Sequence, residues 1–355
     1  MLTRGRRNAT APNQDQAGET VCDISNQECS VSCRHTSGQQ SPNVIVQVNN
    51  DGSALPCTYL SQTSSGSSIA TEITNLTITG QLFARDLTLL LLHFGTPALT
   101  HIKVSGLIDP DFNLDLIHNL TSLKHIDISH NAISRILPSE KCTETVFPIV
   151  KQECRFPPGT QITTLLVNDN VLSDMPKGVL ALFPNLLTLD WSRNQLNALP
   201  THTLEVTPHL RTLWLRGNAI SALHKDMFAP LTHLRELNIG ANLITSVHEL
   251  AFHSLGALTF LAFVNNPITH LAPNTFSTLS ALERLFLDDL QLTTLHENLF
   301  TSNPNLTIAG FDRNLITRVP RHTLSGLSKL QELRLDDNQL TTLSMDLTSL
   351  SNLRF

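Results

Sequence analysis

Hydrophobic positions in the second half of the chain recur with a fixed period of 24 residues. From Ile162 to Phe355, an apolar residue opens each period, two more follow three and five residues later, and an Asn usually follows eight residues later. The opening column is Ile162, Leu186, Leu210, Leu234, Leu258, Leu282, Leu306 and Leu330. The amide column is Asn170, Asn194, Asn218, Asn242, Asn266, Asn314 and Asn338, with Leu290 at the one remaining position. This pattern, LxxLxLxxNxLxxL, predicts a solenoid of stacked repeats.

The apolar columns also predict the local structure of each repeat. The LxL segment is expected to be a short strand whose two Leu side chains point inward, so positions two, four and six of each repeat point outward. One repeat cannot bury its own apolar face, and stability therefore comes from stacking on its neighbours. The Asn is expected inside the coil, where its amide satisfies turning backbone groups. At Leu290 we expect a local irregularity in which a neighbour or water replaces the missing amide.

These repeats resemble the leucine-rich repeats of Toll-like receptors and Slit-type secreted proteins. The resemblance covers residues 73–355 and implies an α/β repeat fold. The expected shape is a horseshoe solenoid with a parallel β-sheet on its concave face and a mostly irregular convex side. A column of Phe residues is expected to fill the side opposite the strands. That column is Phe228, Phe252, Phe276 and Phe300.

The chain is expected to divide into three parts. Residues 1–20 are predicted to be disordered, residues 21–72 to form a cysteine-containing N-terminal cap, and residues 73–355 to form the solenoid. The step between the repeats that start at Leu123 and Ile162 is 39 residues, which places an insertion at about 139–153. The final residues open a new repeat without a polar cap, so we expect the sequence to be incomplete at one or both ends.

Cysteine placement favours an oxidising compartment. Cys22, Cys29, Cys33 and Cys57 lie in the expected cap, where two disulfides allow three connectivities and a four-thiolate zinc site is the competing interpretation. Cys142 and Cys154 stand near the two ends of the insertion. We expect a disulfide there, the alternative being two free buried thiols.

Glycosylation signals point in the same direction. Asn-x-Ser/Thr triplets at Asn75, Asn119 and Asn305 are candidate glycan acceptors. Together with the cysteines, they favour an extracellular or cell-surface location. No signal peptide is visible after the basic start, and no apolar run approaches the ~18 residues of a membrane span. A membrane link is therefore expected only through a missing segment.

Charge and motifs exclude several classes of function. The formal net charge of −6 lacks the basic excess typical of nucleic-acid binders. Most of the fifteen histidines share repeat phases instead of converging on one site; His101, His125 and His130 on adjacent rungs are the candidate metal ligands, and we favour no metal there. No catalytic or phosphate-binding motif appears. We therefore predict a protein that is not an enzyme and has no cofactor.

The outward positions of the predicted strands are the candidate binding surface. They carry three aromatic residues within four consecutive repeats, followed by a charged sector. Exposed aromatic patches are typical of interaction sites, although neighbouring concave side chains could instead cover one another. The candidate partner-binding residues are Trp214, Arg216, Phe260, Phe286, Asp288, Asp312, Arg334 and Asp336.

The leading hypothesis is a non-enzymatic recognition module that binds a protein ligand on its concave face. It would be an extracellular receptor ectodomain or a secreted binding protein. The alternative is an intracellular scaffold, or the targeting part of a longer signalling enzyme such as a receptor kinase. Both rest on the fold resemblance and the concave residues, because fold alone does not determine function.

Overall fold

The computed structural model describes residues 19–25, 30–35, 43–49, 73–94, 98–117, 120–138, 161–200, 202–342, 345–348 and 350–354. The first half contains β1 (Glu19–Ser25), β2 (Ser30–His35), β3 (Asn43–Asn49), β4 (Asn75–Leu82), α1 (Ala84–Phe94), β5 (His101–Leu107), β6 (Asp111–Asn113), the 3₁₀ turn η1 (Leu114–Ile117), β7 (His125–Asp127), β8 (Arg135–Leu137) and β9 (Thr164–Leu166). The second half contains α2 (Lys177–Leu180), β10 (Thr188–Asp190), η3 (Thr203–Val206), β11 (Thr212–Trp214), β12 (Ala222–Leu223), β13 (Glu236–Asn238), β14 (Ser246–Val247), β15 (Phe260–Ala262), β16 (Arg284–Phe286), β17 (Ile308–Gly310) and β18 (Glu332–Arg334).

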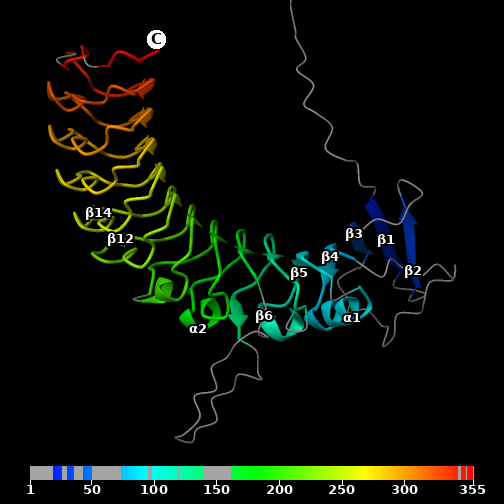
Figure 1. Ribbon diagram of the computed structural model, residues 1–355. Helices are drawn as coiled ribbons and strands as arrows, with labels where there is room; N and C mark the ends of the chain where they lie inside the picture. The colour runs from blue at the N-terminus through cyan, green and yellow to red at the C-terminus, as the bar shows by residue number, and fades with distance from the viewer. Residues whose placement is uncertain are drawn as a thin grey trace, which may run out of the picture.

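One long sheet organises the molecule. Among the described residues it has fourteen strands in the order β18-β17-β16-β15-β13-β11-β10-β9-β7-β5-β4-β3-β1-β2, and all neighbours are parallel except β1 and β2. The register keeps equivalent repeat positions side by side, as with Leu213 beside Leu237. The stack curves into an arc with the main strands on its inner side (Figure 1). The predicted horseshoe solenoid with a concave parallel sheet is therefore confirmed.

The inward columns form one continuous core. The opening residue of each repeat is buried from Ile162 to Leu330, and the two apolar residues that follow it are buried as far as Phe311, whereas Leu333 and Leu335 are half-buried. Behind the strands, successive rings of the predicted Phe column stack at centroid distances of 6.0, 6.4 and 6.1 Å. Trp191 is fully buried, as its place in an inward column requires. Core growth is thus linear, one layer for each repeat.

The Asn column is a hydrogen-bonded ladder inside the coil. Asn218 donates from Nδ2 to the carbonyl of Leu215 in its own repeat and to that of Trp191 in the preceding repeat, at 2.9 and 3.0 Å. Its Oδ1 accepts from the backbone N–H of Leu196 at 3.0 Å. Each amide therefore joins two adjacent turns, which satisfies backbone groups that the turns would otherwise leave unpaired.

At Leu290 the ladder changes as expected, and a neighbour supplies the missing acceptor. The backbone N–H of Ile268, which an Asn at position 290 would bind, donates instead to the carbonyl of Asn266 at 2.9 Å. Pro267 lies between these two residues. Leu290 itself is buried and packs in the hydrophobic core. The altered hydrogen bond therefore lies in the repeat that begins at Leu258, one repeat before the one that contains Leu290.

The N-terminal turns build the same sheet from longer strands. β4 and β5 have eight and seven residues, whereas the later main strands have three. The ladder continues through β3 to β1, which begins at Glu19. The short apolar run from Leu87 to Leu92 lies in α1. In the part of the chain that the structure describes, no helix has the length and apolarity needed to cross a bilayer.

The cysteine predictions fall mostly outside the described residues. Cys29, Cys57, Cys142 and Cys154, and the insertion at 139–153, lie in undescribed segments. Cys22 and Cys33 stand opposite each other in the antiparallel register of β1 and β2, although their side chains are not described.

Candidate functional site on the concave face

The eight predicted binding residues all lie on main strands or two residues beyond them. Trp214, Phe260, Phe286 and Arg334 belong to β11, β15, β16 and β18, where alternation turns them away from the core. The three aromatic side chains are half-buried, as outward residues flanked by neighbouring strands should be. Trp191, one residue beyond β10 in an inward column, provides the contrast because it is fully buried.

Two Phe and two Arg side chains form a contiguous cluster on strands β15, β16 and β18. The rings of Phe260 and Phe286 lie 5.6 Å apart with a tilt of 48°. The guanidinium of Arg284 lies 5.0 Å from the Phe260 ring centre, and that of Arg334 lies 5.8 Å from the Phe286 ring centre. Cation–π contacts of this kind hold long Arg side chains in place and leave their donors available at the surface. Glu332 accepts one of these donors, Nε of Arg334.

Trp214 does not join this cluster. It stands three rungs from Phe286, and among the described residues it makes no ring contact with either Phe. The predicted single aromatic patch is therefore a pair of rings plus a separate indole. Arg216, two residues beyond Trp214, is exposed.

The three predicted acidic residues form a ladder along position six. Asp288 Oδ1 accepts the backbone N–H of Asp312, and Asp312 Oδ1 accepts that of Asp336, both at 2.9 Å. Asp288 is buried, and this burial raises the pKa of its carboxyl above the ordinary value. Asp312 is half-buried and Asp336 is exposed. The carboxylates therefore become more accessible to solvent from Asp288 towards Asp336.

Two concave glycines shape this surface, and sequence reasoning missed them. A Cβ at Gly240 would lie 3.2 Å from Nη1 of Arg216, and one at Gly310 would lie 2.7 Å from Oδ1 of Asp288. Each glycine therefore makes room for a charged side chain from the preceding rung. The sequence did offer a signal for them, because a glycine at an outward position of a repeat stands where a side chain is expected.

The histidines do not form a metal site in the described part of the chain. His101 and His125 lie on adjacent strands with ring centres 5.3 Å apart, but His130 lies beside Asp169, with Nδ1 and Oδ2 at 3.5 Å. Burial and the neighbouring His101 lower the pKa of His125. Among the described residues, no group of three or more His, Cys, Asp or Glu side chains could hold a metal ion.

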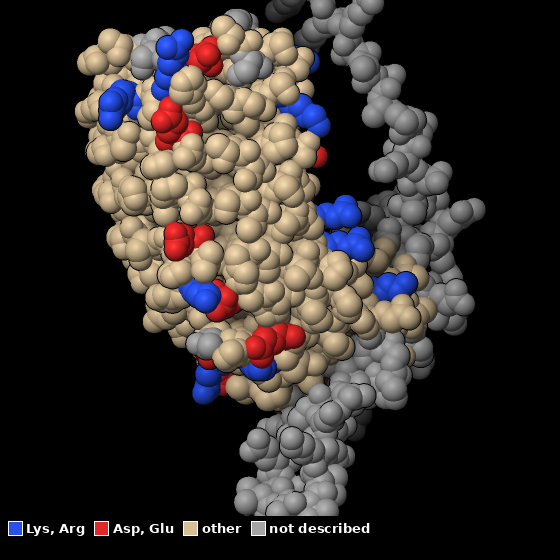
Figure 2. Space-filling view, turned by 60° about the vertical axis from the view of Figure 1, so that its left-hand side comes forward, with Lys and Arg blue, Asp and Glu red and all other residues tan. Residues whose placement is uncertain are grey.

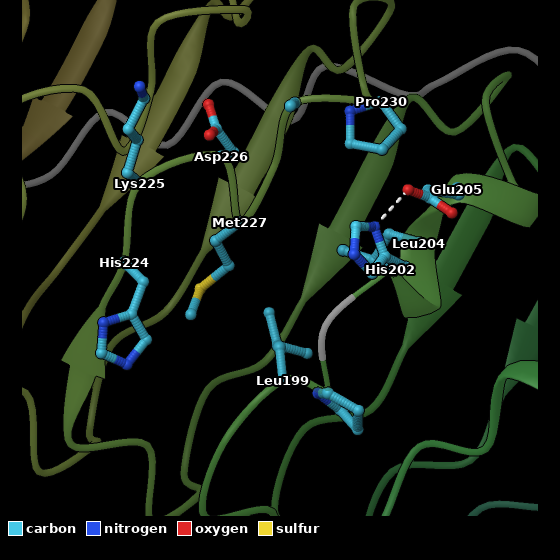
Figure 3. A pocket seen from close by; sticks show the side chains of 11 residues that line it. Leu199, His202, Leu204, Glu205, His224, Lys225, Asp226, Met227 and Pro230 are labelled. Atoms are coloured by element: carbon cyan, nitrogen blue, oxygen red, sulfur yellow. Dashed lines mark hydrogen bonds and ion pairs between the residues drawn. The ribbon is translucent and has the colours of Figure 1, made fainter.

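A small pocket of about 200 Å³ opens on the other side of the coil, between η3 and the next turn. Leu199, Leu204 and Met227 supply apolar walls, and His202 and Glu205 face each other on one side (Figure 3). Glu205 also accepts from Lys177 at 3.0 Å. Glu205 is therefore already paired with His202 and Lys177, and Asp226 lies beside His253, with Oδ1 and Nε2 at 3.5 Å.

The predicted glycan acceptors differ in their surroundings. Asn75 opens β4 and is half-buried, while Asn119 lies outside the described residues. Nδ2 of Asn305, the atom that would carry a glycan, donates to the carbonyl of Ser280 at 2.9 Å. Its Oδ1 accepts from Lys329 at 2.7 Å.

Comparison with known families agrees with this architecture. Models of the leucine-rich repeat match residues 208–268 and 122–142. The chain therefore contains leucine-rich repeats. No curated protein sequence matches it significantly.

Solved structures show the same fold at low sequence identity. The chain is similar to TLR13 in its complex with ssRNA13, with 21% identity and a TM-score of 0.68 over 88% of this chain and 42% of that one. It is similar to Drosophila Toll in the Toll–Spätzle complex, with 17% identity and a TM-score of 0.60 over 92% and 42%. A leucine-rich repeat protein of Leptospira interrogans gives 24% identity and a TM-score of 0.60 over 80% and 69%. The chain thus spans less than half the length of the TLR13 and Toll chains.

Proposed function

We propose that this chain is a non-enzymatic recognition module that binds a protein ligand on its concave face. The observation that carries the proposal is the cluster of Phe260, Phe286, Arg284 and Arg334, with Trp214 further along the same sheet. Aromatic and Arg side chains dominate the energetics of protein interfaces, and cation–π contacts pre-organise them here. The exposed carboxylates beside the cluster favour a partner with basic or mixed charge.

A protein is a better fit to this surface than a nucleic acid. The concave positions around the cluster carry Glu236, Asp288, Asp312, Glu332 and Asp336, which outnumber the nearby arginines. Charged residues are also sparse on the convex side of the C-terminal half, and the view in Figure 2 reveals no continuous basic stripe there. A phosphate backbone needs such a stripe. The ssRNA of the TLR13 complex and the Spätzle of the Toll complex are ligands of those proteins, and the second is the kind we propose here.

The proposal is tested by panning. A displayed library of secreted and cell-surface domains is selected on the wild-type chain, on a Trp214→Ala/Phe286→Ala variant and on Arg211→Glu. Arg211 is exposed one position into its repeat, outside the concave positions, and serves as the control. We expect domains that are enriched on wild type and control and lost on the concave variant. Equal enrichment on all three would contradict the concave site.

The extracellular setting is part of the same proposal, and the register of β1 and β2 supports it. Directly opposed residues of an antiparallel pair have Cα atoms about 4.5–5.5 Å apart, within the range that a disulfide spans. Cys22 and Cys33 occupy such positions, so of the three possible connectivities we favour the one with this pair. Non-reducing peptide mapping should recover a Cys22–Cys33 cross-link. Six free thiols in protein purified without reductant would favour the intracellular scaffold instead.

A further inference from the structure

The side of the coil that holds the Asn ladder carries an exposed surface on which charged and apolar residues follow an unusual order. We call it the Asn-side flank and define it by positions seven and nine of each repeat. Position seven has positive φ in consecutive turns, for example 51° at Arg193 and 50° at Ala241. At position nine the backbone N–H is used within the stack, as when Leu243 donates to the carbonyl of Ile220 at 2.9 Å. The side chains of both columns are therefore what the flank presents to its surroundings.

Exposed apolar side chains recur along this flank. Among the described residues, six large hydrophobic side chains are exposed, and four of them stand at position nine. These four are Ile108 at 39%, Val171 at 39%, Leu243 at 57% and Leu315 at 42%. Scattered exposed apolar residues are ordinary on a protein surface, but these four recur in a single column, two or three rungs apart, and so mark one side of the coil.

Charged residues stand at both ends of position seven and leave its middle uncharged. At one end Arg193 donates to Asp169, with Nη2 and Oδ2 at 2.6 Å. At the other end Arg313 donates to Asp289 through two bonds of 2.6 and 2.7 Å. The three repeats between the two ion pairs carry Gly217, Ala241 and Asn265.

The order of these residues is self-complementary about the repeat that begins at Leu234. Reversing the rung order about that repeat pairs Arg193 with Asp289 and Asp169 with Arg313. One rung further out, His130 meets Asp337. At position nine the same operation pairs Val171 with Leu315, Gln195 with Gln291, Ala219 with Pro267, and Leu243 with itself. Opposite charges therefore match along position seven, and apolar and amide pairs match along position nine.

This operation corresponds to a real symmetry of two curved molecules. A two-fold axis that lies in the plane of the flank and runs from the concave to the convex side reverses the rungs and preserves each column. It also superimposes the two arcs, so curvature does not separate the paired columns. Eight rung spacings of about 4.8 Å give a contact strip about 38 Å long.

We propose that the Asn-side flank binds a second copy of this chain in an isologous, antiparallel dimer with its two-fold axis at Leu243. Charge complementarity identifies the partner as a second copy of the chain. Each end of the strip would bring together two Asp and two Arg side chains in an alternating cluster. Leu243, between Ala219 and Pro267, supplies an apolar centre, and the ion pairs at the two ends lie beside Val171 and Leu315. The proposal is independent of the concave site, which lies on a different face.

Two single charge reversals test this symmetry. In a homodimer of Arg193→Glu, the introduced carboxylate would face Asp289 of the other copy. In a homodimer of Asp289→Lys, the introduced ammonium group would face Arg193. A mixture of the two variants pairs the introduced carboxylate with the introduced ammonium group at one end and keeps Asp289 with Arg193 at the other.

The measurement is sedimentation velocity on wild type, each variant, their equimolar mixture and Arg211→Glu as the control. Thermal melts establish that each variant is folded. We expect wild type and Arg211→Glu to dimerise with the same dissociation constant. Each reversal alone should weaken dimerisation at least tenfold, and the mixture should restore it as a heterodimer.

A substitution on the axis completes the test. Leu243→Glu, which places two carboxylates against each other at the two-fold axis, should also be monomeric. Wild type that stays monomeric at its highest soluble concentration would overturn the proposal. A mixture of folded variants that fails to dimerise, or a Leu243→Glu variant that dimerises like wild type, would overturn it equally.

Discussion

The concave face and the Asn-side flank are both built from outward positions of the same repeats, yet their patterns differ. On the concave face, contacts join different columns and reach across more than one rung: Phe260 at position two contacts Phe286 at position four, and Arg334 lies over the Phe286 ring from two rungs away. On the flank, the charged residues pair along one column, as Arg313 does with Asp289. The two surfaces show that one periodic scaffold can present unrelated patterns on adjacent faces.

The concave face also serves as an internal control for the flank. The same reversal about the repeat at Leu234, applied to position four, pairs Trp214 with Ala262 and Asp190 with Phe286. Trp214 with Ala262 is an apolar pair, but Asp190 with Phe286 sets a carboxylate against an apolar ring, and only the outermost pair, Asp127 with Arg334, joins opposite charges. The flank differs because opposite charges match at two successive rungs on each side of its centre. An asymmetric concave surface suits a different partner, whereas a symmetric one suits a second copy.

The largest expected effect is a difference in stability between substitutions of the inward Trp191 and the outward Trp214. Trp191→Ala should lower the free energy of unfolding by about 3–5 kcal/mol, because it leaves a large cavity in the stack. Trp214→Ala should leave it nearly unchanged, because its half-buried side chain faces the concave surface. Denaturant unfolding measures both. A similar loss in the two variants would contradict the assignment of faces.

Trp191→Phe provides the matched control for that comparison. The indole Nε1 of Trp191 is buried without a hydrogen-bond partner. Phe removes this unpaired donor and keeps most of the ring volume, so the loss should be much smaller than for Ala. A loss equal to that of Ala would show that ring shape, and not volume, decides the packing at this rung.

A smaller effect concerns pH and the buried end of the acidic ladder. Burial raises the pKa of Asp288 in the folded state, so its ionisation opposes folding. The contribution of Asp288 to folding stability is most favourable below the pKa that this residue has in the unfolded chain. It is lost as the pH rises through the higher pKa of the folded protein. Asp288→Asn keeps an acceptor for the Asp312 N–H and should raise the melting temperature near pH 7, with the gain vanishing near pH 3. A variant less stable than wild type at pH 7 would show that the charge itself is needed.

Much of the fold could be predicted because a single period specifies it. Columns of Leu, Phe and Asn have one consistent arrangement, and the burial of Trp191 and Phe263 follows from counting positions. Side-chain contacts on the concave face could not be predicted in this way. Whether Trp214 reaches Phe260, or Arg334 covers Phe286, depends on rotamers and on space left by neighbours such as Gly310.

The structural consequence of Leu290 could likewise be predicted only in part. The sequence indicated that a hydrogen bond was missing, and a neighbour was one of the two expected replacements. That the N–H of Ile268 would turn to the carbonyl of Asn266, beside Pro267, depends on backbone geometry that no periodicity encodes. The buried packing of Leu290 was likewise visible only in the structure.

The most direct test of concave recognition is a binding titration with one domain isolated by the panning experiment. Its affinity is measured for wild type, Trp214→Ala, Phe286→Ala and the flank variant Leu243→Glu. We predict that each concave substitution weakens binding by about 2 kcal/mol or more, roughly 30-fold, as buried aromatic anchors do. The flank variant should bind like wild type. Normal binding by both concave variants, with loss in Leu243→Glu, would contradict the account and place recognition on the flank.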